Sequence, residues 1–203
     1  MDGTLIKDRS IFVFSEILGF KDKVLSSINS KKQPYEKSIE IARLLKGIDQ
    51  RRCLEIFDTI PLQPHVESVA SLLREKKIIT AIATDSYLFL AKHLQQRLHF
   101  DYSYANNLII KENIITGRIE IHNKKQTRCD NGKIYSICKE DVLKNLCNKL
   151  NITSDQVIAV GDGLVDIGMI QKAGLGIAFN APEEVNNHAD VCTNNLHDIT
   201  QYL

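Results

Sequence analysis

Two carboxylates and two glycines follow a short apolar run in the last third of the chain. Residues 157–160 read V-I-A-V, Gly161-Asp162-Gly163 comes directly after them, and Asp166 lies four residues beyond Asp162. The run is typical of a buried parallel strand, and the glycines allow a tight turn at its carboxyl end. Two acids at that position provide the hard oxygen donors that Mg²⁺ prefers. The alternative is that both acids cap the helix that follows.

Three further polar groups are predicted at the ends of strands or at the starts of helices. They are Asp2-Gly3-Thr4, Thr84-Asp85-Ser86 after the apolar segment 78–83, and Lys139. In an open α/β sheet, ligands bind at the carboxyl ends of the strands. Each group alone is weak evidence, because a threonine hydroxyl is often bonded to backbone and a lysine at a helix start is usually solvated. Their order and spacing together predict acids that hold a metal ion, and a hydroxyl and an ammonium that hold an anion.

The elements that must position these residues differ along the chain. The first part has apolar residues at helical spacing only, and Pro34 and Gly47 suit the two ends of a helix. The predicted helices cover 10–20, 23–29, 34–47 and 50–58.

From residue 64 onward, helices and strands alternate. The pattern predicts helices over 65–76, 86–98 and 139–150, a helix that begins near Leu164, buried strands over 78–83, 157–160 and 175–179, antiparallel strands within 105–121, and a helical tail from Leu196. Such alternation predicts an α/β fold with a doubly wound parallel sheet. We expect residues 1–8 and 62–203 to form this core and residues 9–61 to form a small helical cap over the strand ends.

The composition is that of an ordinary globular protein and gives no sign of a nucleic-acid-binding or membrane protein. The chain has 203 residues, 43% hydrophobic content and a formal net charge of +1, which gives no indication of a nucleic-acid or membrane surface. We find no pattern of a signal peptide or a membrane span, so a cytoplasmic monomer or homodimer is expected. The five cysteines form no CxxC pair, which favours reduced thiols.

The arrangement resembles the haloacid dehalogenase (HAD) superfamily and, within it, the phosphoserine phosphatase-like branch. The resemblance covers nearly the whole chain. It is strongest over residues 156–190, which include V-I-A-V-G-D-G-L-V-D and A-G-L-G-I-A-F-N-A-P, and over residues 101–117, D-Y-S-Y-A-N-N-L-I-I-K-E-N-I-I-T-G. It implies a HAD-like Rossmannoid core with a helical cap inserted near the N-terminus.

The resemblance also implies a role for each polar group. Asp2 matches the general acid/base that protonates the leaving oxygen and later activates water, with its main-chain carbonyl as a metal ligand. Thr84 matches the hydroxyl that holds a phosphoryl oxygen, and Lys139 the ammonium that neutralises the phosphate. The implied catalytic residues are therefore Asp2, Thr84 and Lys139. The implied Mg²⁺ site consists of Asp2, Asp162 and Asp166.

The sequence departs from the family pattern at its start. The nucleophile that forms an aspartyl-phosphate in this family would be the residue before Met1, and the strand that leads to it would also precede Met1. About five buried aliphatic residues in such a strand would contribute on the order of 10 kcal/mol. We therefore expect the native product to be longer and the first core strand to be missing from this sequence.

Other departures concern specificity. Arg9 stands where phosphoserine phosphatases usually carry a glutamate for the substrate ammonium, and Arg43 lies near the expected place of their carboxylate-binding arginine. Val165 and Asp85 replace an asparagine and a glycine of the family. The predicted phosphate- and substrate-binding residues are Thr84, Asp85, Lys139, Arg9 and Arg43. An arginine that faces the site would repel an ammonium, so a small phosphomonoester other than phosphoserine is favoured.

The sequence therefore predicts a Mg²⁺-dependent hydrolase that acts on a small phosphorylated metabolite. Two alternatives stay open. The absent nucleophile and Val165 are also compatible with a non-catalytic protein that binds phosphate or a partner. A phosphotransferase that passes the phosphoryl group to an alcohol is the third possibility.

Overall fold

The computed structural model describes residues 1–129 and 131–203. Its first sheet has the strand order β1 (Ala81–Tyr87), β2 (Tyr102–Lys111) and β3 (Ile114–Glu120). β1 and β2 are parallel, whereas β2 and β3 form an antiparallel hairpin. The hairpin turn is Glu112-Asn113, and both residues have positive φ, as a tight two-residue turn requires. The antiparallel pair predicted within 105–121 is therefore confirmed.

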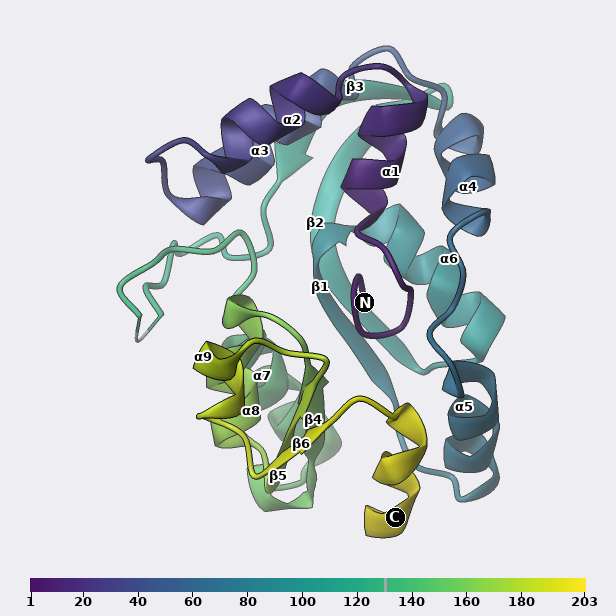
Figure 1. Cartoon of the computed structure of the whole chain (residues 1–203), viewed down its shortest axis with the longest axis vertical. Helices are drawn as coiled ribbons and strands as arrows, with labels where there is room; N and C mark the ends of the chain where they lie inside the picture. Colours follow the sequence, from purple (N-terminus) through teal and green to yellow (C-terminus); the bar gives the residue numbers. More distant parts are fainter. Residues whose placement is uncertain (130) are drawn as a thin grey trace.

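The second sheet is parallel throughout. It consists of β4 (Ile158–Gly161), β5 (Leu175–Phe179) and β6 (Val191–Thr193), with Ile158 opposite Leu175 and Ile177 opposite Val191. β1 and β4 each form one edge of their sheet. The N-terminus lies between the two sheets in Figure 1.

Helices accompany both sheets (Figure 1). α6 (Leu88–Leu98) packs on the first sheet, and α5 (Val66–Glu75) packs on α6. α7 (Lys139–Leu150), α8 (Ile167–Lys172) and α9 (Glu183–Asn186) lie beside the second. Short 3-10 helices η1 (Ser154–Gln156), η2 (Leu164–Asp166) and η3 (Leu196–Tyr202) complete this part of the chain. The α/β fold with parallel core strands agrees with the sequence prediction.

The helical block between residues 10 and 58 forms the upper part of the molecule in Figure 1. It contains α1 (Ser10–Ile17), α2 (Lys21–Ile28), α3 (Pro34–Leu44) and α4 (Gln50–Asp58). Local signals start two of these helices. The Gln33 amide donates to the Glu36 carboxylate before Pro34, and the Asp49 carboxylate accepts from the Arg51 amide at 2.7 Å.

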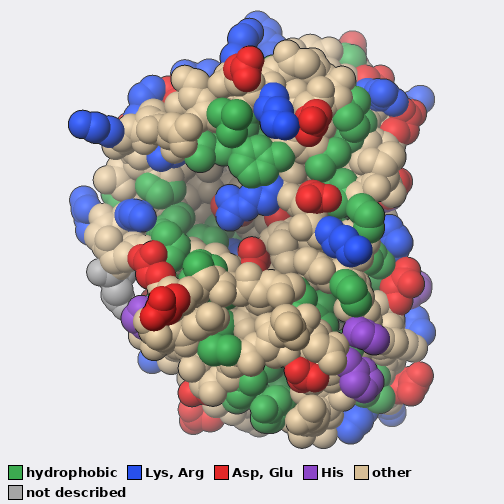
Figure 2. Space-filling view, in the orientation of Figure 1, with side chains coloured by type: hydrophobic (Ala, Val, Ile, Leu, Met, Phe, Trp, Pro, Cys, Tyr) green, Lys and Arg blue, Asp and Glu red, His purple; other side chains and the backbone are tan. Residues whose placement is uncertain are grey.

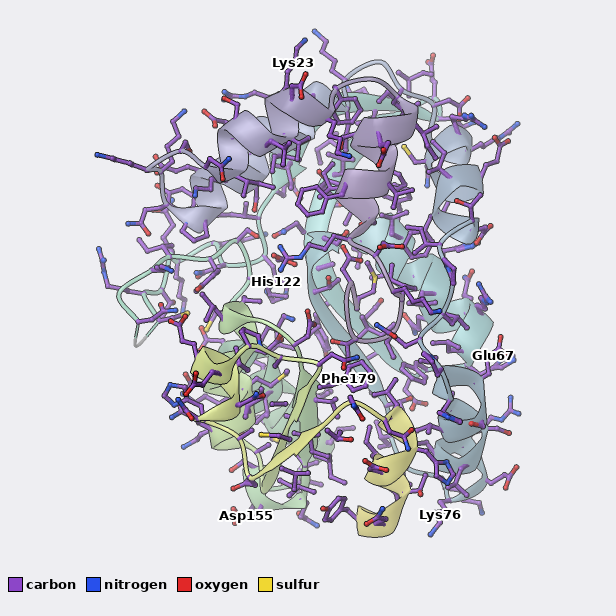
Figure 3. All side chains as sticks on the ribbon, viewed as in Figure 1. Lys23, Glu67, Lys76, His122, Asp155 and Phe179 are labelled. Carbon is purple, nitrogen blue, oxygen red and sulfur yellow. The ribbon has the colours of Figure 1, made fainter. Side chains whose placement is uncertain are left out.

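One hydrophobic cluster joins this helical block to the sheets. Phe14 of α1, Phe57 of α4, Leu90 and Leu94 of α6 and Ile115 of β3 are all buried in it. Each such side chain stabilises the fold by roughly 1.5–3 kcal/mol. Figure 3 shows how densely the side chains fill the space between the ribbons, with Phe179 near the centre. α1 and α4 are therefore fixed on the α/β core.

The predicted strand over 78–83 is displaced in the structure. β1 runs from Ala81 to Tyr87 and not over 78–83, so Thr84 lies inside the strand instead of beyond its end. Sheet pairing starts late because the amide and hydroxyl of Thr80 both donate to the Asp101 carboxylate, at 2.8 and 2.9 Å. The helical tail predicted from Leu196 is confirmed, as the 3-10 helix η3. None of the helices in the described ranges is long and apolar enough to cross a bilayer.

Candidate active site

The predicted site residues meet at one cavity of about 490 Å³ between α1–α3 and the ends of the two sheets. Figure 2 shows a hollow between the upper and lower parts of the molecule, with lysine and arginine side chains at its border. Its lining includes every predicted site residue except Arg43: Asp2, Arg9, Thr84, Asp85, Lys139, Asp162 and Asp166. A volume of this size is typical of small-molecule sites.

Lys139 and Asp166 form a buried ion pair at the floor of this cavity. Lys139 is the first residue of α7, and its Nζ donates to Asp166 Oδ1 at 2.5 Å. The two side chains are only 7% and 3% exposed. Burial by itself lowers the pKa of Lys139, but the carboxylates of Asp166 and Asp85 outweigh this effect and hold the pKa above its usual value. The ammonium is therefore charged and fixed in place.

Asp166 also fixes the loop that follows β4. Its Oδ2 accepts hydrogen bonds from the amides of Asp162 and Gly163, at 3.2 and 3.0 Å. The close approach depends on Gly161, because a Cβ there would lie 2.4 Å from Asp166 Cβ. Asp166 thus caps the amides at the start of η2, as the capping interpretation of the sequence expected. It holds the loop in the position that turns Asp162 toward the cavity.

Asp162 is tied to the N-terminal turn across the whole sequence. Thr4 Oγ1 donates to Asp162 Oδ1 at 2.6 Å. Gly3, with a φ of 79°, lies so close that a Cβ there would be 2.3 Å from Asp162 Oδ2. Oδ2 accepts no hydrogen bond from the part of the chain that the structure describes. This leaves Asp162 with one oxygen that another ligand can use.

Asp2 is held on one side only. Its Oδ2 accepts from the amide and hydroxyl of Ser10, at 3.2 and 2.9 Å, whereas its buried Oδ1 has no hydrogen-bond partner among the described residues. The Ser10 hydroxyl also lies 3.1 Å from the Ser86 hydroxyl. Burial, with a further contribution from the Asp85 charge, raises the pKa of Asp2 to about 6. A carboxyl with this pKa can both give and take a proton near neutral pH.

Thr84 brings a hydroxyl to the same cavity. Its Oγ1 accepts from the Ser86 amide at 3.2 Å, and its own proton has no acceptor in the described part of the chain. The parallel pairing of β1 with β2 shifts register between Ala83 and Tyr87. Thr84 therefore lies in an irregular stretch of the strand, where its hydroxyl is free to donate to a ligand.

Sequence reasoning missed a polar network behind this strand. The buried Asn106 of β2 donates from Nδ2 to the Asp85 carbonyl at 2.6 Å and to the Ser136 hydroxyl at 2.9 Å, and its Oδ1 accepts from the His122 amide. Ser38 of α3 donates to the same Ser136 hydroxyl at 3.2 Å. The network links β1, β2, α3 and the segment before α7. These partners are far apart in sequence, so no local pattern marks them.

The two predicted arginines lie in different places. Arg9 comes directly before α1 and lines the cavity, and one of its guanidinium nitrogens would lie 4.0 Å from a Cβ placed on Gly163. Arg43 is not among the described lining residues. It is exposed on α3, where its backbone packs against Gly117 of β3. The structure therefore brings Arg9, but not Arg43, to the other predicted residues.

The donor set suits a metal ion that shares its ligands with a substrate. The described residues contain no cluster of three or more histidine, cysteine or acidic side chains that could hold a metal ion. Mg²⁺, however, is commonly bound through one or two carboxylates together with phosphate oxygens and water. The free Oδ2 of Asp162 fits this mode. Asp166 has both oxygens occupied by Lys139 and by loop amides, which fits a supporting acid better than a ligand.

The sequence is similar to those of proteins of known class. A family model described as haloacid dehalogenase-like hydrolase matches residues 133–201. The phosphoserine phosphatase of Campylobacter jejuni is 32% identical over 149 residues, which cover 73% of this chain and 67% of the relative. That of Archaeoglobus fulgidus is 30% identical over 196 residues, but this chain spans only 54% of its length. That of Methanocaldococcus jannaschii is 26% identical and is covered over 94% of its length.

Solved structures agree with this likeness. A crystal structure of a phosphoserine phosphatase in the apo form superposes with a TM-score of 0.82 at 25% identity, over 100% of this chain and 95% of the other. A substrate-bound phosphoserine phosphatase complex gives a TM-score of 0.83 at 24% identity, with the same coverage. The fold and the site define a hydrolase-type α/β protein. The chain belongs to the haloacid dehalogenase superfamily, in its phosphoserine phosphatase-like branch.

Proposed function

We propose that the protein is a Mg²⁺-dependent phosphatase that hydrolyses a small phosphomonoester through an aspartyl-phosphate. The observation that carries this proposal is the meeting of Lys139, Thr84 and Asp162 around one cavity. Transfer of a phosphoryl group requires mainly positioning and neutralisation of charge. An ammonium, a free hydroxyl and a free carboxylate oxygen meet that requirement. The phosphatase relatives of similar sequence support the same reaction class.

Each residue receives a role from its surroundings. Lys139, held by Asp166, neutralises the negative oxygens of the phosphoryl group. Thr84 donates its free hydroxyl proton to one of these oxygens. Asp2, with a pKa of about 6, protonates the leaving alcohol oxygen and then takes a proton from the water that cleaves the aspartyl-phosphate. The protons balance because the residue ends each cycle in the form in which it began.

The same proposal assigns the metal ion. Asp162 would bind Mg²⁺ through its free oxygen, with the Asp2 carbonyl as a second ligand and Asp166 as the acid that holds the loop. When bound, the ion would neutralise phosphate charge and orient the phosphoryl group. The chain's own residues would position this group between the ammonium of Lys139 and the carboxylate of Asp162.

We further propose that residues 9–61 act as a cap on a core of residues 1–8 and 62–203. Residues from α1 and α3 and from the connection after α2 line the upper wall of the cavity, which supports this division. A cap in this position would keep bulk water from the phosphoryl group. A cytoplasmic enzyme that acts on a soluble phosphorylated metabolite is the setting that fits best.

The decisive experiment tests for the aspartate nucleophile that an aspartyl-phosphate requires. We would assay p-nitrophenyl phosphate with the chain as given and with an N-terminal strand that ends in Asp before Met1. The matched control is the same strand ending in Asn. Hydrolysis that requires both the Asp extension and Mg²⁺ is the expected result. The absence of hydrolysis in all three forms would support the phosphate-binding alternative, with which Val165 is also compatible.

A further inference from the structure

The carboxylates of the cavity lie on one of its two walls, whereas cations line both, with Lys133 and Lys139 on the same side as the acids. Its carboxylates, Asp2, Asp85, Asp162 and Asp166, all come from outside the α1–α4 block. Within the described residues, the wall formed by the helical block contributes lysines and an arginine but no carboxylate. We call Arg9, Lys31, Lys32 and Lys37 the basic wall. Figure 2 shows lysine and arginine side chains beside the hollow, in line with this division.

The members of the basic wall differ in whether their charged groups already have partners within the protein. Lys32 is paired with Glu40, and Lys37 donates to the Ile28 carbonyl at 2.6 Å. Arg9 and Lys31 form no ion pair with the described residues. Arg9 is also the member nearest to the loop that carries Asp162, because its guanidinium lies beside Gly163. Its charge is thus available to a ligand that occupies the phosphate site.

Each acid of the opposite wall already has a partner or a proposed role. Asp166 pairs with Lys139, and Asp85 lies near enough to the same ammonium for its charge to raise the pKa of Lys139. Asp162 is the proposed metal ligand and Asp2 the proposed proton donor. Among the described lining residues, the helical block supplies no acid that could pair with a substrate ammonium. A cation on the substrate would instead face Arg9 and Lys31. The part of the substrate beyond the phosphate therefore meets positive charge, together with apolar surface from Ile11 and Phe12.

We propose that the substrate is a phosphomonoester with a second anionic group, a carboxylate or a phosphate, and without an ammonium. The second anion binds Arg9, with Lys31 as a further cation of the basic wall. This inference rests on the proposed function for the position of the first phosphate. It goes further by naming the chemical class of the leaving alcohol. Opposite charges at a partly exposed site such as this one change affinity by about tenfold at low salt.

The test compares ligands that share a phosphate and differ in their second charge. They are ethyl phosphate, O-phosphoethanolamine, 2-phosphoglycolate, ethane-1,2-diyl bisphosphate and O-phosphoserine. Calorimetry with Mg²⁺ gives the Kd of each ligand, and phosphate release gives kcat/KM where the protein turns the ligand over. We expect 2-phosphoglycolate or the bisphosphate to bind about tenfold more tightly than ethyl phosphate, and O-phosphoethanolamine more weakly. Which of the two binds more tightly distinguishes a carboxylate from a phosphate.

Variants assign the effect to Arg9. The Arg9 side chain makes no capping hydrogen bond at α1, so Arg9→Gln and Arg9→Glu should fold, which melting curves would check. Arg9→Gln should abolish the preference for the second anion, and Arg9→Glu should invert it in favour of O-phosphoethanolamine. Arg51→Glu, an exposed charge change on α4 away from the cavity, is the matched control and should leave the order unchanged.

The outcomes separate the two proposals. If the binding order and its inversion hold but no ligand is hydrolysed by any form, including the Asp-extended one, the proposed phosphatase function fails and the basic wall stands. If ethyl phosphate is hydrolysed but O-phosphoserine or O-phosphoethanolamine binds as tightly as 2-phosphoglycolate and the bisphosphate, the proposed phosphatase function stands and this inference is overturned. It is also overturned if Arg9→Glu leaves the order unchanged, or if no ligand binds at all.

Discussion

The Nζ of Lys139 lies 2.5 Å from Oδ1 of Asp166, and both side chains are buried from solvent. The first residue of α7 is thereby connected to the end of η2, and the loop between β4 and η2 is held from both directions. A buried charge that loses its partner is costly because it can no longer be solvated or neutralised. This pair is therefore a point at which the stability of the site can be measured.

We predict that Lys139→Met lowers the free energy of unfolding by about 3–5 kcal/mol, since it leaves the Asp166 carboxylate buried and unpaired. Urea unfolding would measure the change. Lys144→Met on the same helix is the matched control, because Lys144 pairs with Glu140 at 2.5 Å but is half exposed. Its loss should cost about 0.5 kcal/mol. Equal losses for the two variants would show that burial adds nothing to the Lys139–Asp166 pair.

Gly3→Ala should disrupt the contact between the N-terminal turn and the loop after β4. Gly3 has a φ of 79°, and a Cβ there would come within 2.3 Å of Asp162 Oδ2. Gly19→Ala is a control for the backbone conformation alone, because Gly19 has a φ of 77° and nothing within 4 Å of its Cβ position. We expect Gly19→Ala to cost about 1 kcal/mol and Gly3→Ala clearly more. Thermal melts of both variants would decide, and similar melting temperatures would contradict the close approach.

The sequence predicted those elements whose signals are local. The bounds of α4, α7 and β5 coincide with the predicted ranges because polar helix starts and a buried apolar run lie within the segments themselves. The start of β1 was wrong because Asp101, twenty-one residues away from Thr80, binds the Thr80 amide. The same distinction between local and distant signals holds for the site. Motif residues were found from their spacing, whereas Ser10 and Asn106 act through partners that only the tertiary structure supplies.

His122 predicts a pH dependence of stability. Burial, assisted by the nearby Lys124 charge, lowers the pKa of His122 below its ordinary value of 6.5, so the folded protein binds a proton there less readily than the unfolded chain. With respect to His122, the free energy of unfolding is therefore highest above pH 6.5. Part of it is lost as the pH falls from 6.5 through the lowered pKa, because the unfolded chain takes up the proton first. The ring lies edge-on to Tyr104, and Figure 3 places His122 among side chains near the middle of the molecule.

His122→Gln should flatten the dependence of the unfolding free energy on pH between about pH 7 and 5. The size of the effect is set by the difference between the pKa of His122 in the folded protein and in the unfolded chain. Urea unfolding at several pH values would measure the slope. His197→Gln, at an exposed position in η3, is the control for the loss of a histidine. A slope for His122→Gln that equals that of the unsubstituted protein would exclude His122 as the source.

Removal of the Asp162 charge should abolish stabilisation by Mg²⁺ without loss of the fold. Asp162→Asn keeps an oxygen that accepts from the Thr4 hydroxyl, so the contact between the N-terminal turn and the loop is retained. For the unsubstituted chain, Mg²⁺ at a hundredfold excess over its Kd would add about 2.7 kcal/mol to the free energy of unfolding. Melting temperatures with and without Mg²⁺ should show this shift in the unsubstituted chain and in Asp155→Asn, an exposed acid of η1, but not in Asp162→Asn. An equal shift in all three proteins would place the ion elsewhere, because a carboxylate that binds Mg²⁺ directly cannot be neutralised without loss of affinity.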